Sequence, residues 1–199
     1  MNKDMLIIIL NGPSASGKST ILECLMADPQ CSSLLQKPVT ATTRKPRPGE
    51  VNGIDYWFLT PEEFDGERKR GNIIEEAEYA GANYGSLKSE LQRISELGKH
   101  AITILEINGV EAMKKVYGQE RVVGIYIYRD LKEIFEELKK RPIGKKEMEE
   151  RFERAIEEHS HMARFNNIVY NTGNIEDSVK QTIEIINREI QRLTGRLAV

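Results

Sequence analysis

Residues 12–20 read GPSASGKST and fit the pattern G-x-x-x-x-G-K-[ST]. An apolar run, MLIIIL at residues 5–10, has the length of a buried strand, and the helix-forming stretch ILECLM follows at residues 21–26. Strand, glycine loop and helix in this order offer backbone N–H groups and a helix N-terminus to phosphates. We therefore predict a nucleotide-phosphate site, in which Lys18 reaches the β- and γ-phosphates and Ser19 ligates Mg²⁺. The alternative is a chance match in an ordinary βα turn. The predicted site residues are Gly12, Pro13, Ser14, Ala15, Ser16, Gly17, Lys18, Ser19 and Thr20.

Size and composition favour one α/β domain with insertions. The chain has 199 residues, and its 29 basic and 31 acidic side chains give a net charge of −2, which favours neither nucleic acid nor a membrane surface as partner. Cys24 and Cys31 are expected to be reduced thiols. There is no signal-peptide pattern and no apolar run of membrane-spanning length. The sequence thus predicts a cytoplasmic protein, and it identifies no protein partner.

Strands alternate with helices along most of the chain, which predicts a doubly wound parallel sheet. Short strands between the first and second βα units indicate a small inserted α+β subdomain. We assign residues 1–37 and 98–199 to a core P-loop domain, with a charged helical lid at about 138–160, and residues 38–97 to the insertion. Within the insertion, Thr60 is predicted to cap one helix with a capping box, and Ser86 or Ser89 to cap the next.

A stiff basic loop follows the strand at residues 37–43. It reads RKPRPGEVNG at residues 44–53, and its prolines and glycines can present Arg44 and Arg47 to one target. Two guanidinium groups suit the forked recognition of a phosphate. A solvated charged loop is the alternative for this segment taken alone.

Four stretches together resemble the guanylate kinase family, over nearly the whole chain. They are the glycine loop, VTATTRKPRPGEVNGIDYWF at residues 39–58, IIEEAEYAGANYGS at residues 73–86 and ILEINGVEA at residues 104–112. The resemblance implies that the insertion binds GMP and that residues 12–20, with Asn171 near the adenine, bind ATP. Mg²⁺ is the implied cofactor.

The GMP-binding residues follow from the same resemblance. Arg44, Arg47 and the hydroxyls of Tyr56 and Tyr84 are expected to hold the GMP phosphate. Glu75 is expected to read guanine, because a carboxylate accepts from N1–H and the 2-amino group together, a donor pair that adenine lacks. The neighbouring Glu76 points to the opposite face of its strand, into solvent. The hydroxyls of Thr40 and Ser86 are expected to contact the base.

The chain departs from the family pattern in two places. The family usually has D-x-D where this chain has Ile104-Leu105-Glu106, and Glu106 is expected to contact either guanine or the water shell of Mg²⁺. In the lid, a usual arginine is Glu137 and a usual glycine is Pro142. The catalytic lid arginines implied by the resemblance are Arg151, then Arg141, with Arg154 the weakest match. Without the resemblance, this charged helix is a solvated face.

The implied activity is transfer of the γ-phosphoryl group of ATP to GMP by an ATP:GMP phosphotransferase. Two alternatives stay open: a kinase for another small phosphorylated acceptor, and a guanylate-kinase-like module that binds phosphopeptides without transfer. The intact Gly17-Lys18-Ser19 argues against the second alternative, because a scaffold needs no nucleotide cradle.

Overall fold

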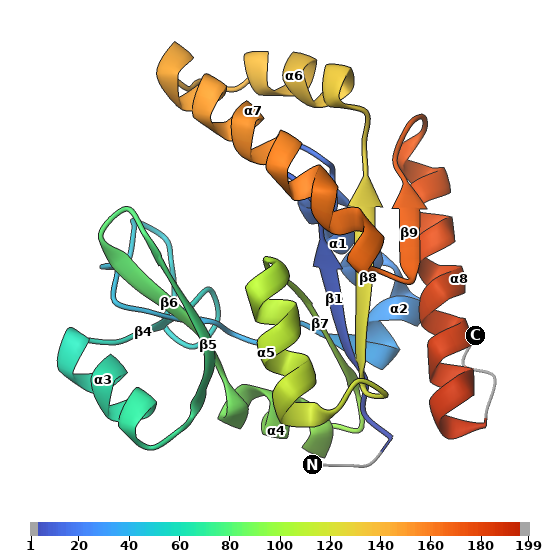
Figure 1. Cartoon of the computed structure of the whole chain (residues 1–199). Helices are drawn as coiled ribbons and strands as arrows, with labels where there is room; N and C mark the ends of the chain where they lie inside the picture. The colour runs from blue at the N-terminus through green and yellow to red at the C-terminus, as the bar shows by residue number, and fades with distance from the viewer. Residues whose placement is uncertain (1–3, 196–199) are drawn as a thin grey trace.

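The apolar run before the glycine loop forms β1 (Ile7–Asn11), the middle strand of a five-stranded parallel sheet (Figure 1). This is a computed structural model, and it describes residues 4–195. The sheet consists, in spatial order, of β2 (Leu35–Gln36), β7 (His100–Ile104), β1, β8 (Val122–Tyr128) and β9 (Asn167–Tyr170). All the described pairings in it are parallel. The predicted α/β fold with a parallel central sheet is confirmed.

Helices cover both faces of this sheet, and β1 is buried throughout because its side chains alternate between them. Leu6, Ile8 and Leu10 pack with one group of helices, and Met5, Ile7 and Ile9 pack with the other. The first group contains α1 (Lys18–Ala27), α2 (Pro29–Leu34) and α8 (Ile175–Thr194). The second group contains α4 (Lys88–Glu96) and α5 (Ile107–Tyr117).

A second, four-stranded sheet lies to one side of the first (Figure 1). Its spatial order is β4 (Trp57–Phe58), β3 (Ala41–Thr42), β6 (Ala82–Leu87) and β5 (Ile73–Tyr79), and α3 (Pro61–Lys69) packs against it through Phe64. The assignment of residues 38–97 as a functional subdomain stays a prediction. The last helix of that range, α4, packs on the central sheet through Leu91 and Ile94.

Two helices cross above the carboxyl ends of the central strands (Figure 1). They are α6 (Leu131–Lys139) and α7 (Lys145–His159), and the short 3₁₀ helix η1 (Ser160–Arg164) leads from α7 to β9. The rings of Phe135 and Phe152 lie 5.0 Å apart and join the two helices. Ala15 of the glycine loop packs in the same apolar cluster, so the predicted lid region rests directly on the loop.

The helix ends test the predicted caps. Thr60 caps α3 with the predicted capping box. The predicted serine cap of α4 is wrong: Leu87 occupies the N-cap position without a side-chain bond, and the N–H of Ser89 is satisfied by Asn72 Oδ1 at 2.9 Å. The two cysteines are free thiols, as predicted. Within residues 4–195, no helix is both long and apolar enough to cross a membrane.

Candidate nucleotide-binding and phosphoryl-transfer site

The glycine loop between β1 and α1 adopts backbone angles that its glycines allow. Gly12 has φ 133° and Gly17 has φ 100°, both in the region that side chains disfavour. A Cβ atom at Gly12 would lie 2.5 Å from the carbonyl oxygen of Ile127, so the loop can lie this close to β8 only with glycine there. Helix α1 begins directly at Lys18, and its first N–H groups lack partners within the helix. The loop is therefore shaped to receive an anion.

Side chains from the far end of the chain hold the loop from behind. Asn171 donates from Nδ2 to the carbonyl of Ser16 at 2.8 Å, and its Oδ1 accepts from the hydroxyl of Ser178 at 3.0 Å. Arg129 donates to the carbonyl of Ala15 at 3.1 Å. Asn171 thus supports the loop from a buried position after β9. Its predicted contact with ATP stays a prediction.

Lys18 folds back over the loop that carries it. Its Nζ donates to the carbonyls of Gly12 and Pro13, at 2.5 and 2.7 Å. Burial lowers the pKa of Lys18 to about 8, against the opposing attraction of Glu158. The charge of Arg141 lowers the pKa of Lys18 further and the charge of Glu106 raises it. Charges near the lid and at the start of α5 therefore both act on the ammonium group. An anionic phosphate here would supply the counter-charge that the buried ammonium lacks.

We expect the lowered pKa of Lys18 to make the Lys18→Met variant more stable than the unchanged protein at pH 7, by about 1–3 kcal/mol. The folded-state pKa lies below the unfolded value of 10.5, so the cost of the buried charge is full below pH 8. As the pH rises from 8 to 10.5, the lysine loses its proton and the cost disappears.

Urea unfolding of both proteins at pH 7, 8.5 and 10, without nucleotide, measures this difference. The free energies of unfolding should converge as the pH rises. A difference that does not change with pH, or a less stable variant at pH 7, would show that burial of the Lys18 charge is not costly.

A cleft of about 780 Å³ opens in front of Lys18. The glycine loop forms one wall through Gly12 and Ser14, and the end of β5 contributes Tyr79. The start of α5, with Glu106, and the cleft-facing side of α7 complete it. One cavity therefore joins the central sheet, the small sheet and the predicted lid. The α7 residues that line it are Glu147, Glu150, Arg151, Arg154, Glu157 and Glu158.

The predicted lid arginines lie in two environments. Arg151 lines the cleft and is held by Glu147 at 2.7 Å, and the more exposed Arg154 lines it too. Arg141 is exposed after α6 and acts on Lys18 through its charge. Glu137, where the family usually has arginine, is paired with Lys140 at 3.1 Å. The catalytic roles of the three arginines stay predictions.

The residues predicted to bind the acceptor phosphate lie on or beside the loop at residues 44–53, which we call the arginine loop. Arg44 makes a two-pronged pair with Glu50, at 2.8 and 2.9 Å, and its guanidinium lies 5.3 Å from the ring centre of Tyr56. Tyr84 meets Tyr56 edge-on at 5.9 Å. Hydrogen bonds from Arg44, and from the backbone of Arg47, lower the pKa of Glu50 to about 2. Glu50, which the sequence did not single out, therefore orders the loop, while the Arg47 side chain is exposed.

Two residues predicted to contact guanine, Glu75 and Ser86, lie next to each other; their contact with guanine stays a prediction. Ser86 lies opposite Glu75 in the β5–β6 ladder and donates its hydroxyl to Glu75 Oε1 at 2.7 Å. Burial raises the pKa of Glu75 against the hydrogen bonds from Ser86, and the nearby charges of Glu106 and Glu76 add to the rise. Glu76 points away and pairs with Arg68 at 2.9 Å. A half-buried carboxylate with one oxygen already satisfied is suited to a specific pair of donors.

Thr40 and Glu106 lie in connections: Thr40 between β2 of the central sheet and β3 of the small sheet, and Glu106 between β7 and α5. Thr40 is half-buried, and its carbonyl accepts from the backbone N–H of Trp57 at 2.9 Å. Glu106 occupies the N-cap position of α5 without a side-chain cap bond, and it is exposed to the cleft. Its charge acts on both Lys18 and Glu75. Contacts of either residue with nucleotide or metal stay predictions.

Comparison with known proteins agrees with this geometry. A family model described as guanylate kinase matches residues 4–189. The chain belongs to the guanylate kinase family. It is 34% identical to a guanylate kinase of Clostridium perfringens strain SM101, over 94% of this chain and 85% of that protein. It is also 34% identical to one of Clostridium acetobutylicum, over 95% and 88% of the two chains. The crystal structure of guanylate kinase from Anaplasma phagocytophilum matches with a TM-score of 0.67 at 26% identity, covering 93% of this chain and 86% of that one.

The oxygen donors of this family member fit a magnesium ion. Mg²⁺ prefers oxygen ligands, and in nucleotide sites it is held by one or two protein oxygens together with substrate phosphates. Ser19 is exposed in the first turn of α1, where it lines a neighbouring cavity of about 830 Å³, and Glu106 lines the cleft of about 780 Å³. Among the described residues, no group of three His, Cys, Asp or Glu side chains could hold a metal alone. The donor set suits an ion that the nucleotide itself largely coordinates.

Two residues of the guanylate kinase site gave no signal in the sequence. Glu158 has a buried carboxylate oxygen without a hydrogen-bond partner, and its charge acts on Lys18. Burial raises the pKa of Glu158, against the attraction of Lys18. The second of these residues is Arg129, which supports the glycine loop through the carbonyl of Ala15. Both lie in charged stretches where neighbouring residues are solvated, so only the three-dimensional contacts distinguish them.

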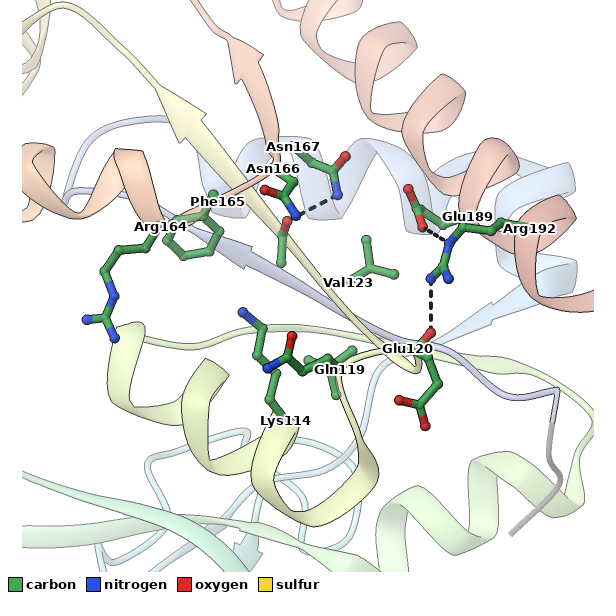
Figure 2. A pocket seen from close by; sticks show the side chains of 12 residues that line it. Lys114, Gln119, Glu120, Val123, Arg164, Phe165, Asn166, Asn167, Glu189 and Arg192 are labelled. Carbon is green, nitrogen blue, oxygen red and sulfur yellow. Dashed lines mark hydrogen bonds and ion pairs between the residues drawn. The ribbon is translucent and has the colours of Figure 1, made fainter.

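A second polar cavity of about 460 Å³ lies away from the guanylate kinase cleft (Figure 2). It adjoins the start of β8, whereas the glycine loop adjoins Ile127 near the strand's end. Its Arg192 is held by Glu189 at 2.7 Å and by the carbonyl of Glu120 at 3.0 Å. None of the predicted site residues lines it. The side chains drawn with labels in Figure 2 are Lys114, Gln119, Glu120, Val123, Arg164, Phe165, Asn166, Asn167, Glu189 and Arg192.

Proposed function

We propose that this protein transfers the γ-phosphoryl group of ATP to GMP, giving ADP and GDP. The observation that carries the proposal is the single cleft bordered by the glycine loop, the end of β5 and Glu106. Glu106 lines this cleft and acts electrostatically on both Lys18 and Glu75, although Glu75 itself does not line it. The donor site and the predicted guanine-reading residue are therefore linked through one carboxylate at the cleft. The guanylate kinases to which the chain is similar support this assignment.

The acceptor group determines what the protein must do. An oxygen of the GMP phosphate is already ionised, so the reaction needs no general base, and catalysis consists of alignment and charge neutralisation. Lys18 and the amides of residues 14–19 hold the β- and γ-phosphates, while Arg151 and Arg141 approach the transferred group from the lid. Mg²⁺, held by Ser19 and the phosphates, would offset phosphate charge when bound.

On the acceptor side, the chain binds and orients GMP. Arg44, Arg47 and the hydroxyls of Tyr56 and Tyr84 neutralise the phosphate dianion and fix its rotation. In this step the phosphate competes with the carboxylate of Glu50 for Arg44. The hydrogen bonds to Glu50 raise the pKa of Arg44. Glu75, with Ser86 and Thr40, selects guanine. Closure of residues 38–97 and of the lid toward the glycine loop excludes water, which would otherwise accept the phosphoryl group. A cytoplasmic location, which the sequence predicts, suits a kinase of free nucleotides.

A coupled assay of ADP release tests the proposal directly. With ATP and Mg²⁺, we expect GMP to be phosphorylated with a kcat/KM at least a hundredfold above those for AMP, UMP and CMP. A preference for another monophosphate would favour the kinase for a different acceptor. No release with any of the four, from a protein that still binds ATP, would favour the phosphopeptide module.

A further inference from the structure

Glu90, in the first turn of α4, has a buried carboxylate that contacts three separate parts of the chain. Its side chain is 5% exposed. Oε2 accepts from the backbone N–H of Val39 at 3.0 Å, and Oε1 accepts from the indole N–H of Trp57 at 3.2 Å. Arg93 donates to the same carboxylate, at 2.7 Å for its closest nitrogen. Burying a charge is costly unless several donors satisfy it, and here they do.

The partners of Glu90 belong to different structural parts. Helix α4 is fixed to the central sheet, since Leu91 and Ile94 pack in its core. Val39 lies in the connection that leaves β2 of the central sheet for β3 of the small one, and Trp57 begins β4. Glu90 therefore joins the connection and an edge strand of the small sheet to a helix of the core.

The same bonds reach the residues proposed to bind GMP. Thr40 follows Val39, and Tyr56 precedes Trp57. The Trp57 ring also lies under the arginine loop, where a Cβ atom at Gly53 would be 3.0 Å from it. A displacement of Val39 or Trp57 would therefore move the base-contacting threonine and one phosphate-contacting tyrosine together.

A cavity of about 830 Å³ borders the connection, and Glu90, Arg93 and Trp57 line it together with residues of α1 and β7. The Glu90 bonds therefore hold the connection at a place where a gap lies between it and the core. Burial would raise the pKa of Glu90, but the bonds from Arg93, Val39 and Trp57 outweigh burial and lower it, so Glu90 is the charged acceptor at neutral pH. The cavity is lined on the two sides by Val39, Thr40 and Tyr56, and by Ser19, Leu22 and Thr103.

We propose that Glu90 is a positioning residue for GMP: its carboxylate fixes Val39 and Trp57, and through them Thr40 and Tyr56, relative to the central sheet. This inference rests on the proposed function. It predicts that loss of the carboxylate weakens GMP binding and leaves ATP binding unchanged, because the donors to Glu90 are Val39, Trp57 and Arg93 and none of them belongs to the glycine loop. Glu90 itself follows the family-like stretch at residues 73–86, and the resemblance assigns it no role.

The test compares Glu90→Ala and Glu90→Gln with the unchanged protein. We expect Glu90→Ala to raise the KM for GMP about tenfold, equal to about 1.4 kcal/mol, with the KM for ATP within twofold. Glu90→Gln keeps one acceptor oxygen for Val39 or Trp57 and should recover part of the loss, to about threefold. Trp57 is the only tryptophan, so its fluorescence reports the indole environment and gives a GMP Kd independent of turnover.

Two further variants separate positioning from stability. Trp57→Phe replaces the indole by a smaller phenyl ring, so the N–H bond to Glu90 is lost while the Val39 and Arg93 bonds remain. It should raise the KM for GMP about threefold even if Glu90→Ala does not fold. Glu189→Ala is the matched control, because this carboxylate is 13% exposed, pairs with Arg188 and Arg192 on α8, and lines the second cavity, not the one beside the connection. It should lower the melting temperature without changing the KM for GMP.

The outcomes distinguish this inference from the proposed function. If the unchanged protein releases no ADP with GMP, the proposed function fails. If the unchanged protein does release ADP with GMP, but the folded Glu90 and Trp57 variants keep the KM for GMP within twofold, the positioning role is wrong. Equal increases in the KM for GMP and for ATP would also overturn it, because they would indicate a general loss of structure.

Discussion

Lys18→Ala is expected to lower the turnover of GMP by about a thousandfold or more, the scale on which loss of a phosphate charge clamp acts in phosphoryl transfer. Nζ sits between the carbonyls of Gly12 and Pro13 at the floor of the cleft, where the β- and γ-phosphates are proposed to bind. Alanine removes the charge that offsets the negative charge on the transferred group and leaves the loop backbone in place. The coupled ADP assay measures the loss.

Binding of GMP separates this effect from misfolding. Apart from Glu106 at the start of α5, the predicted GMP contacts lie on β5, on β6, next to β3 and β4, and on the arginine loop. Trp57 fluorescence should therefore report a GMP Kd within about threefold of the unchanged value. Lys114→Ala is a suitable control, because Lys114 lines the second cavity (Figure 2) and should leave turnover unaffected. Turnover preserved in Lys18→Ala would refute the assignment of the glycine loop as the donor site.

The central sheet and the glycine loop could be predicted because their signals are local. An apolar run buried on both faces is readable from consecutive residues, and the loop needs glycine at two fixed positions. The capping box at Thr60 is equally local, since both of its partners lie within one turn. The two-residue strand β2 was not predicted, because Leu35–Gln36 is too short for any periodicity and is defined only by its pairing with β7.

Residues that act over long separations could not be predicted. Arg129 supports Ala15 from 114 positions away, and Glu90 accepts from Val39 across 51 positions. In the sequence, each is one charge among many, and the partner that gives it a role is set by the tertiary fold. The serine cap of α4 was mispredicted for the same reason, because Asn72 already satisfies the N–H of Ser89.

The two departures from the family pattern have different structural contexts. Glu137 forms an exposed pair with Lys140, while Arg151 and Arg154 line the cleft and Arg141 acts on Lys18, so positive charge is still available from the lid. Ile104 packs against the apolar core at the end of β7. The remaining carboxylate, Glu106, is therefore the acidic group of this segment that acts on both Lys18 and Glu75.

Glu75→Gln is expected to lower kcat/KM for GMP by about a hundredfold while changing that for AMP by less than threefold. Each charge-assisted hydrogen bond to the carboxylate contributes about 1.5–3 kcal/mol, and an amide can accept from only one of the two guanine donors. Its NH₂ group would also face the second donor. Because burial already raises the pKa of Glu75, the preference for GMP in the unchanged protein should also weaken as the pH falls toward that pKa.

The adjacent Glu76→Gln supplies the control, since Glu76 points to the other face of β5 and pairs with Arg68. It removes the same charge, one residue away, and should leave the preference for GMP over AMP unchanged. Competition assays with both monophosphates at pH 5.5 and 7.5 compare the three proteins. If Glu75→Gln kept the preference, guanine would have to be selected by other groups, such as Ser86, Thr40 or Glu106. If both variants lost it equally, the effect would come from the charge of the strand and not from a specific pair of hydrogen bonds.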